Sequence, residues 1–158
     1  RIKVNSIVDE QIIDALYRAS RAGVEVQLWV RGICSIKPGV PGLSDNIVLR
    51  SIVGRYLEHS RVFAFWNDGD EEVFIGSADM MHRNLDRRVE TLIQLTSSEH
   101  MRDIQQHFDT AMSPRTAGWW GEPDGTWTRR FEAEDGTPLD DLHRDRMIQI
   151  QRRKRSSR

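Results

Sequence analysis

Apolar residues recur at two different spacings along this chain, and the spacings predict its first elements. Residues 9–22 carry apolar side chains three and four positions apart, which indicates an amphipathic helix with one buried face. Asp9 is suited to cap the start of this helix, and Gly23 is suited to end it. Residues 2–4 and 24–30 alternate between apolar and polar side chains, which indicates a strand on either side. A strand, a helix and a strand within about 30 residues form a βαβ unit, so we expect parallel strands with a right-handed crossover.

The same patterns predict the remaining elements. Further strands are expected at residues 47–52, 62–66, 73–75 and 89–95, with two short ones between residues 119 and 131. Helices are expected from a capping box at residues 96–99 to Met112 and from Pro138 to about Gln151, with a helical turn at residues 53–58. A hairpin of antiparallel strands added to a parallel pair gives a mixed sheet. The sequence therefore predicts a single α/β domain with a mixed β-sheet flanked by helices.

Length and composition agree with one globular domain. The chain has 158 residues, of which 38% are hydrophobic and 30% are charged. Its apolar runs are far shorter than the roughly 20 residues that a membrane-spanning helix needs, and it shows no signal peptide, so we expect a cytoplasmic location. The first residue is Arg1 rather than Met, and we interpret the chain as a piece of a longer protein. A single cysteine, Cys34, excludes an internal disulfide, and we expect its thiol to be buried and inert.

The charge is unevenly spread. The formal net charge is −1, yet five of the last eight residues are basic, so the rest of the chain is acidic. We expect this basic tail, residues 151–158, to be disordered and solvated. Three of the five tryptophans lie close together in sequence, and we expect their rings to cover an open edge of the domain rather than to stack on bases: Trp119, Trp120 and Trp127.

The candidate chemistry surrounds the predicted hairpin of residues 62–75. His59 and Arg61 come before its first strand, and a Gly-Ser-Ala-Asp turn at residues 76–79 follows its second strand. An imidazole can attack phosphorus or transfer a proton. An arginine neutralises phosphate oxygens, and Ser77 with nearby backbone N–H groups can donate hydrogen bonds to them. This combination favours phosphate chemistry.

A second candidate follows the predicted strand at residues 24–30. Arg31 and Gly32 come directly after it, at the carboxyl edge where open α/β sheets bind ligands. Gly32 lets the backbone approach closely, and Arg31 is expected to point into the crevice, although a surface arginine in a loop is the alternative. Arg83 is the arginine after the turn that we expect to face the same crevice. A phosphate-binding P-loop and a kinase glycine-rich loop are both missing from the sequence, which excludes the usual nucleotide kinases.

The half-site around His59 resembles that of the phospholipase D superfamily, which reads His-x-Lys and later Gly-Ser-x-Asn. Arg61 stands where that superfamily has lysine, and Asp79 stands where it has asparagine. A longer resemblance is to one branch of the superfamily, the long-chain polyphosphate kinases, in their C-terminal region. It covers residues 1–115 in blocks that occur in the same order: residues 5–9, 30–34, 51–59 and 77–90.

This resemblance implies a phospholipase D-like sandwich and the reversible transfer of the ATP γ-phosphate to polyphosphate. It implies that His59 is the second of two active-site histidines and that Arg31 contacts the phosphates of ATP or ADP. Arg61, Ser77 and Arg83 become secondary phosphate contacts. The histidine that is phosphorylated and the Mg²⁺ ligands would lie in a preceding domain, with no metal ligand in this chain. We therefore expect this chain to be inactive alone and to work with upstream domains of the same protein.

The resemblance also sets the expected organisation and partners. Residues 1–115 would form the catalytic half-domain, residues 116–150 an extension packed on it, and residues 151–158 the tail. The full-length enzyme is expected to form a homo-oligomer and to bind ATP and polyphosphate but no nucleic acid. Two alternatives remain open. One is a phospholipase D-type phosphodiesterase or nuclease that joins two half-sites in a homodimer, and the other is a polyanion binder that uses the tail and the tryptophans.

Overall fold

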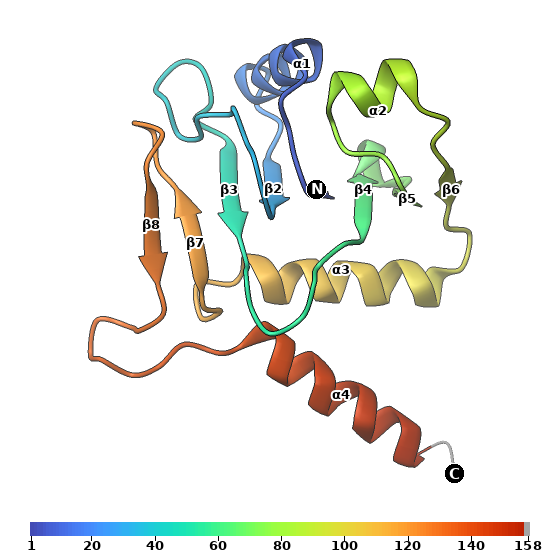
Figure 1. The fold of residues 1–158 in the computed structure, drawn as a ribbon, viewed down its shortest axis with the longest axis vertical. Helices are drawn as coiled ribbons and strands as arrows, with labels where there is room; N and C mark the ends of the chain where they lie inside the picture. Colours follow the sequence, from blue (N-terminus) through green and yellow to red (C-terminus); the bar gives the residue numbers. More distant parts are fainter. Residues whose placement is uncertain (157–158) are drawn as a thin grey trace.

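The computed structural model describes residues 1–156 and contains eight strands in one sheet (Figure 1). The strands are β1 (Ile2–Val4), β2 (Val26–Val30), β3 (Ile47–Ser51), β4 (Arg61–Phe65), β5 (Glu72–Gly76), β6 (Leu92–Gln94), β7 (Gly118–Gly121) and β8 (Trp127–Arg130). Their order across the sheet is β6-β5-β4-β1-β2-β3-β7-β8. Strands β1, β2 and β3 are parallel, and every other neighbouring pair is antiparallel. The sheet is therefore mixed, as the sequence predicts.

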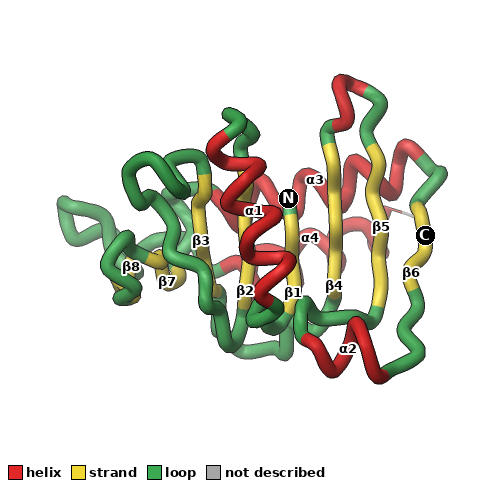
Figure 2. The backbone as a smooth tube through the Cα atoms, turned by 90° about the horizontal axis from the view of Figure 1, so that it is seen from above, coloured by secondary structure: helices red, strands yellow, loops and turns green. Residues whose placement is uncertain are grey.

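Helices cover both faces of this sheet. They are α1 (Glu10–Arg21), α2 (His82–Arg87), α3 (Ser98–Met112) and α4 (Leu142–Ser156), with a short 3₁₀ turn, η1 (Asn67–Gly69), between β4 and β5. Figure 2 shows α1 on one face and α3 with α4 on the other, while α2 lies beyond the ends of β4 and β5. The prediction of an α/β fold with helices flanking a mixed sheet is confirmed. Within the described residues, none of the helices is long and apolar enough to cross a membrane.

The parallel strands are buried on both faces, which places a core on each side of the sheet. Ile2 and Val4 face α1, and the residues around them form the first core cluster. The second cluster lies between the sheet and α3, where Trp29 packs edge-on against Phe108 at 6.0 Å between ring centroids. Burying one large apolar side chain contributes about 1.5–3 kcal/mol. The two core clusters therefore hold the strands in place between the helices, and with them the strand ends at which the site lies.

The predicted βαβ unit is confirmed in detail. The Asp9 carboxylate accepts a hydrogen bond from the backbone N–H of Ile12 at 3.0 Å and so caps α1. Gly23 has a φ of +88° just beyond the helix, a conformation that favours glycine. The capping residue of α3 differs from the prediction, because Ser97 rather than Thr96 accepts the N–H of His100. Thr96 and Ser97 both carry a hydroxyl group that can cap a helix, so sequence alone does not distinguish between them.

Three other expectations differ from the structure. Residues 53–60 form an irregular loop rather than a helical turn, and α2 is a helix that the sequence analysis does not predict. The basic tail is helical through residue 156, because α4 continues with arginines, which favour helix, and without a Gly or Pro to end it. Arg153 also pairs with Asp103 of α3 at 2.7 Å, which holds this part of the helix near the domain. Residues 157–158 of the predicted tail lie outside the described residues.

The C-terminal extension continues the sheet through β7, which pairs with β3. Buried Arg50 of β3 secures this junction by donating hydrogen bonds to carbonyl oxygens of Ala111, Ser113 (2.7 Å) and Thr116 (2.5 Å). Its guanidinium also stacks on the Trp120 ring at 4.2 Å. The tryptophan therefore covers a buried charge at this side of the sheet. The exact boundary between the two predicted parts of the chain stays a prediction.

We expect the Cys34 thiol to react slowly with alkylating reagents. Burial raises its pKa to about 11, compared with about 9 for an unperturbed thiol, and the thiolate is the reactive form. Iodoacetamide labelling at pH 8 should therefore be about 100-fold slower than labelling of free cysteine, a ratio that follows from the two-unit difference in pKa. Labelling in 6 M urea serves as the control and should proceed at the free rate. Equal rates in native buffer would contradict this prediction.

Candidate functional site

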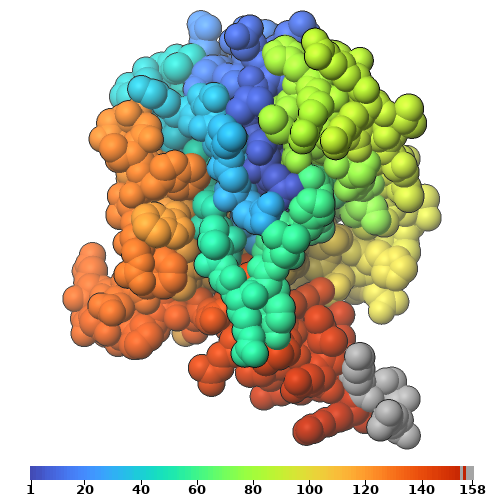
Figure 3. All heavy atoms as spheres, viewed as in Figure 1, coloured from blue at the N-terminus to red at the C-terminus, as the bar shows by residue number. Residues whose placement is uncertain are grey.

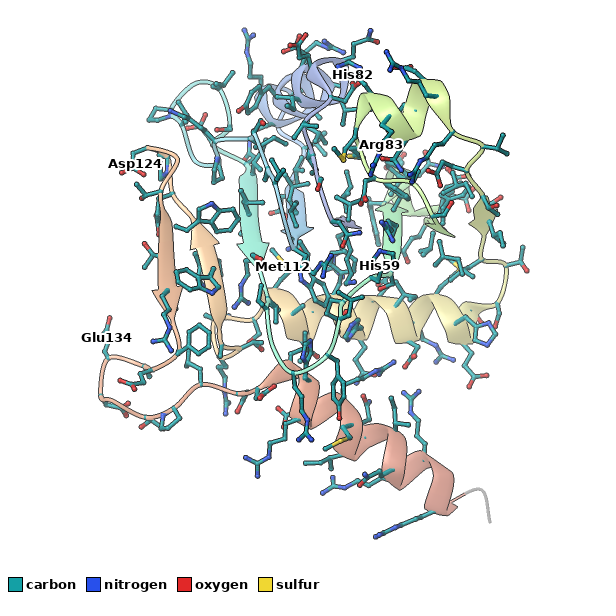
Figure 4. The ribbon with its side chains drawn as sticks, in the orientation of Figure 1. His59, His82, Arg83, Met112, Asp124 and Glu134 are labelled. Atoms are coloured by element: carbon teal, nitrogen blue, oxygen red, sulfur yellow. The ribbon has the colours of Figure 1, made fainter. Side chains whose placement is uncertain are left out.

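Four of the predicted site residues, His59, Arg61, Ser77 and Arg83, line a cavity of about 660 Å³ at one edge of the sheet, whereas Arg31 is not among its lining residues. Parallel strand β1 ends there, β4 begins there, and β5 ends there before the Gly-Ser-Ala-Asp turn. The cavity is lined by Asn5, Ser6, His59, Arg61, Gly76, Ser77, Asp79, Met81, Arg83, Asn84, Arg88 and Glu90. Figure 4 labels His59 below β4 and Arg83 on α2, and Figure 3 shows the surface of the same face.

A buried ion pair lies at the centre of this site. Arg61 and Asp79 are 8% and 6% exposed, and they form two hydrogen bonds. Nη2 of Arg61 donates to Oδ2 of Asp79 at 2.7 Å, and Nε donates to Oδ1 at 3.2 Å. These are the two positions at which the sequence departs from the phospholipase D pattern. The structure shows that the departures contact each other, so the larger cation and the carboxylate compensate as a pair.

Asn5 joins this ion pair to Arg31. The backbone N–H and the Nδ2 amide of Asn5 both donate to the Asp79 carboxylate, at 2.6 and 3.3 Å. Its Oδ1 accepts a hydrogen bond from Nε of Arg31 at 2.9 Å. Gly32 permits this approach, because a Cβ at residue 32 would come within 3.0 Å of the Asn5 carbonyl oxygen. The hydrogen bond to Asn5 therefore orients the Arg31 side chain through its Nε. The two terminal nitrogens of the guanidinium take no part in this bond.

His59 completes the network from the other side. Nη1 of Arg61 donates to the His59 carbonyl at 2.7 Å and lies 3.0 and 3.1 Å from the two ring nitrogens. A guanidinium can only donate, and Nη1 lies almost equally close to both ring nitrogens, so it contacts the imidazole as a whole rather than one nitrogen. In either neutral tautomer one ring nitrogen carries a hydrogen, and this N–H is the group that can donate to a ligand. The exposed imidazole is therefore held by a buried arginine and still accessible from the cavity.

The electrostatics of the network agree with an ionised Asp79. Burial acts to raise the pKa of this carboxyl group, but hydrogen bonds from Arg61 and Asn5 outweigh it, so the pKa is lowered. On the other face of β1, burial lowers the pKa of the Lys3 ammonium, and the nearby Glu58 carboxylate opposes that effect. One carboxylate thus accompanies each buried cation beside the His59 loop.

The secondary candidates are arranged differently. The Ser77 hydroxyl donates to the Glu90 carboxylate and accepts the N–H of Thr91 at 3.0 Å, so its hydrogen is already bonded to another residue that lines the cavity. Hydrogen bonds from Ser77 and Asn84 lower the pKa of Glu90. Arg83 is exposed on α2 and lines the cavity with its side chain. Of the three predicted secondary contacts, Arg83 is therefore the one placed to meet a ligand directly, while Arg61 and Ser77 bond to other residues.

Sequence reasoning assigned no role to Asn5, and it treated Asp79 only as a departure from a known pattern. The signal that could have found Asn5 is its position, since it is a polar residue that directly follows a buried strand, and the neighbouring strand ends just before Arg31. Within residues 1–156, the structure contains no group of three or more His, Cys, Asp or Glu side chains that could hold a metal ion.

Comparisons with known proteins agree with the family resemblance found in the sequence. The model of the family "Polyphosphate kinase C-terminal domain 2" matches residues 1–139. The chain is 55% identical to a polyphosphate kinase of Streptomyces coelicolor over 157 residues, which is 99% of this chain and 21% of that protein. It is 56% identical to a polyphosphate kinase of Mycolicibacterium gilvum over 128 residues, 81% of this chain and 17% of that protein. The chain thus spans about a fifth of the length of these relatives.

Solved structures show the same relationship. A polyphosphate kinase from Porphyromonas gingivalis superposes with a TM-score of 0.87 at 34% identity, over 98% of this chain and 24% of that one. NucT from Helicobacter pylori superposes with a TM-score of 0.54 at 14% identity, over 70% of this chain and 76% of that one, which shows a shared fold. The predicted phospholipase D-like fold is confirmed. The chain therefore belongs to the polyphosphate kinase C-terminal domain family.

Proposed function

We propose that this chain supplies one half of the phosphoryl-transfer site of a longer polyphosphate kinase, which moves the γ-phosphate of ATP reversibly to polyphosphate. The observation that carries the proposal is the continuous network from Arg31 through Asn5, Asp79 and Arg61 to His59. It joins the two residues predicted to contact phosphate, although 28 positions of sequence separate them. Such a network fixes two cationic or donor groups at one edge of the sheet before any ligand arrives.

In this proposal the two groups have different tasks. Arg31 binds the ATP phosphates with its terminal nitrogens, a fork that matches phosphate oxygens. His59 donates a hydrogen bond, or a proton, to the phosphoryl group in transfer. Arg61 orients His59 rather than contacting phosphate itself. The phosphorylated histidine and the Mg²⁺ ligands are proposed to lie in other domains of the full-length enzyme, so this chain alone should not make polyphosphate.

Replacing Arg31 by alanine in the full-length enzyme should raise the KM for ATP. A hydrogen bond to a charged group contributes about 1.5–3 kcal/mol, so the rise should be about 10-fold or more. Lysine at this position keeps the charge but loses the fork, and Arg31→Lys should fall between alanine and wild type. Polyphosphate formation at varied ATP concentration measures this. Arg21→Ala, an exposed arginine at the end of α1, is the matched control and should leave KM unchanged. A wild-type KM in Arg31→Ala would remove the proposed ATP contact.

The alternative function is a phosphodiesterase built from two copies of this half-site. The fold of NucT is compatible with it, but fold alone does not define an activity. Here the cation two residues after His59 is buried and paired with Asp79, which leaves it poorly placed to neutralise a diester. Hydrolysis of bis(p-nitrophenyl) phosphate by this chain, lost in His59→Ala, would favour the alternative. We expect no hydrolysis. A cytoplasmic location and a homo-oligomeric full-length enzyme remain part of the proposal.

A further inference from the structure

The loop of residues 53–60 carries His59, and it depends on contacts with distant parts of the chain. It leaves β3, passes across the face seen in Figure 1 above the start of α4, and returns at β4 (Figure 1). Figure 3 shows the same loop protruding from the surface. Residues 53–57 are exposed. An exposed irregular loop has little intrinsic order, so the groups that hold it decide where the imidazole points.

One anchor comes from inside the sheet. Lys3 of β1 is 2% exposed, and its ammonium donates to the Ser60 carbonyl at 3.1 Å and to the Ser60 hydroxyl at 2.7 Å. The same ammonium lies 3.1 Å from Oε2 of Glu58 and 4.6 Å from the centre of the Trp29 ring. Lys3 therefore holds the residues on both sides of His59. This buried cation in turn relies on the Glu58 carboxylate as its counter-charge.

A second anchor comes from the C-terminal extension. His143 of α4 is 4% exposed, and its Nε2 lies 3.1 Å from Oε1 of Glu58. Its Nδ1 accepts the backbone N–H of Tyr56 at 3.1 Å. When the ring is neutral, an accepting Nδ1 requires the hydrogen to be on Nε2, the nitrogen that lies close to the carboxylate. His143 thus accepts one loop N–H through Nδ1, and its Nε2 lies within ion-pair distance of one loop carboxylate without forming a hydrogen bond to it.

The loop is shaped to receive this ring. A Cβ at residue 54 would come 2.6 Å from Nδ1 of His143, so Gly54 leaves the space that the imidazole occupies. The Tyr56 ring lies 5.8 Å from the His143 ring, and the Tyr56 hydroxyl contacts the sulfur of Met147 at 3.3 Å. These contacts also explain why residues 53–58 are not helical, since the Tyr56 N–H bonds to a side chain rather than to a carbonyl of a helical turn.

We propose that His143 is a positioning residue for the transfer reaction, which holds the His59 loop through Glu58 and Tyr56 and so ties the extension to the site. The inference rests on the proposed function, because it gives His143 a role only if His59 is part of the reaction. The chain of contacts runs from His143 to Glu58, from Glu58 to Lys3, and from Lys3 to Ser60, which is next to His59. A group that acts at a distance in this way affects how well His59 is aligned, and not how tightly ATP is bound.

The test uses substitutions at residue 143 of the full-length enzyme. His143→Ala should lower kcat for polyphosphate synthesis by about 10- to 100-fold, because a displacement of about 1 Å at a reacting group has effects of that size. The KM for ATP should stay within about twofold. His143→Gln places an N–H where Nε2 was, beside the Glu58 carboxylate, so it should recover kcat to within about threefold of wild type. His143→Asn can accept the Tyr56 N–H but cannot reach Glu58, and it should remain impaired.

Hydrogen exchange gives a readout that does not depend on activity. The Tyr56 amide should exchange faster in His143→Ala than in wild type, because its acceptor is removed. Gly54→Ala perturbs the same contact from the loop side and should give the same loss of kcat. Arg144→Gln, the exposed neighbour on α4, is the matched control and should behave as wild type. If His143→Ala does not fold, the comparison of the Gln and Asn variants carries the test.

The outcomes separate this proposal from the proposed function. Wild-type kcat in His143→Ala or His143→Asn, beside an inactive His59→Ala, would overturn the positioning role and leave the proposed function intact. Equal impairment of the Gln and Asn variants would also overturn it, since the link to Glu58 would then not matter. Full activity of His59→Ala would overturn both.

Discussion

Replacing His59 by alanine in the full-length enzyme is expected to lower the rate of polyphosphate synthesis by about 100- to 10,000-fold, the range for loss of a general acid or base. The imidazole lines the cavity, and Nη1 of Arg61 lies 3.0 and 3.1 Å from its two ring nitrogens. Alanine removes the ring N–H that can donate to a ligand, and Arg61 then has no imidazole to orient. The KM for ATP should change much less, because Arg31 and its hydrogen bond to Asn5 are unaffected. Initial rates of polymer formation from ATP measure both parameters.

The control for this experiment is another exposed histidine. His100 lies in the first turn of α3 and does not line the cavity. His100→Ala should retain wild-type activity, so the loss in His59→Ala can be assigned to the site. Retained synthesis in His59→Ala would instead mean that this domain acts as a scaffold or a polymer-binding module.

The second large effect is expected at the buried ion pair. Asp79→Asn or Arg61→Gln should each lower the free energy of unfolding of this 158-residue chain by about 3–5 kcal/mol, because each leaves one charge buried without its partner. The double variant removes both charges and should be less destabilised than the sum of the single variants. Urea denaturation of the four proteins gives this coupling energy. Arg83→Gln removes an exposed arginine from the same cavity and should change stability by less than about 0.5 kcal/mol.

The same pair gives a pH dependence with a defined sign. The pKa of Asp79 is lower in the folded chain than its ordinary value of 3.8. A lowered pKa means that the folded state binds this proton less readily than the unfolded state, so the stabilisation is fully present above the unfolded pKa. It is lost as the pH falls through the folded pKa. The stability difference between wild type and Asp79→Asn should therefore be constant from about pH 5 to pH 8 and shrink below about pH 4. A difference that grows on acidification, or Asp79→Asn at wild-type stability, would contradict this description of the pair.

The elements that sequence could predict are those set by local patterns. The α1 helix, its Asp9 cap and the two flanking strands follow from periodicity and short-range capping, and the structure agrees. The loop at residues 53–60 could not be predicted, because its conformation depends on His143, which is more than 80 residues away in sequence. Helix α2 was missed because it is short and Met81 provides no side-chain cap.

The residues of the candidate site also fall into two groups, those that local patterns predict and those whose roles depend on distant parts of the chain. His59 and Arg31 could be selected from motifs and from the family resemblance, because their positions relative to strand ends are local facts. The roles of Asn5 and Asp79 depend on the register of β1 against its neighbours, which brings residues 74 positions apart into hydrogen-bond contact. Whether Arg61 is free to contact phosphate likewise depends on the residue with which it pairs, and the residue type alone does not show this. Its carboxylate partner becomes visible only once the turn after β5 is placed beside β4.

The most direct test of the central claim is a crystal structure of the full-length enzyme with a non-hydrolysable ATP analogue that has a methylene group between the β- and γ-phosphates. The account predicts that the terminal nitrogens of Arg31 and one ring nitrogen of His59 lie within hydrogen-bond distance of phosphate oxygens, with the Asn5–Asp79–Arg61 network unchanged behind them. An analogue bound with its phosphates away from both residues would contradict the claim that this domain supplies half of the transfer site.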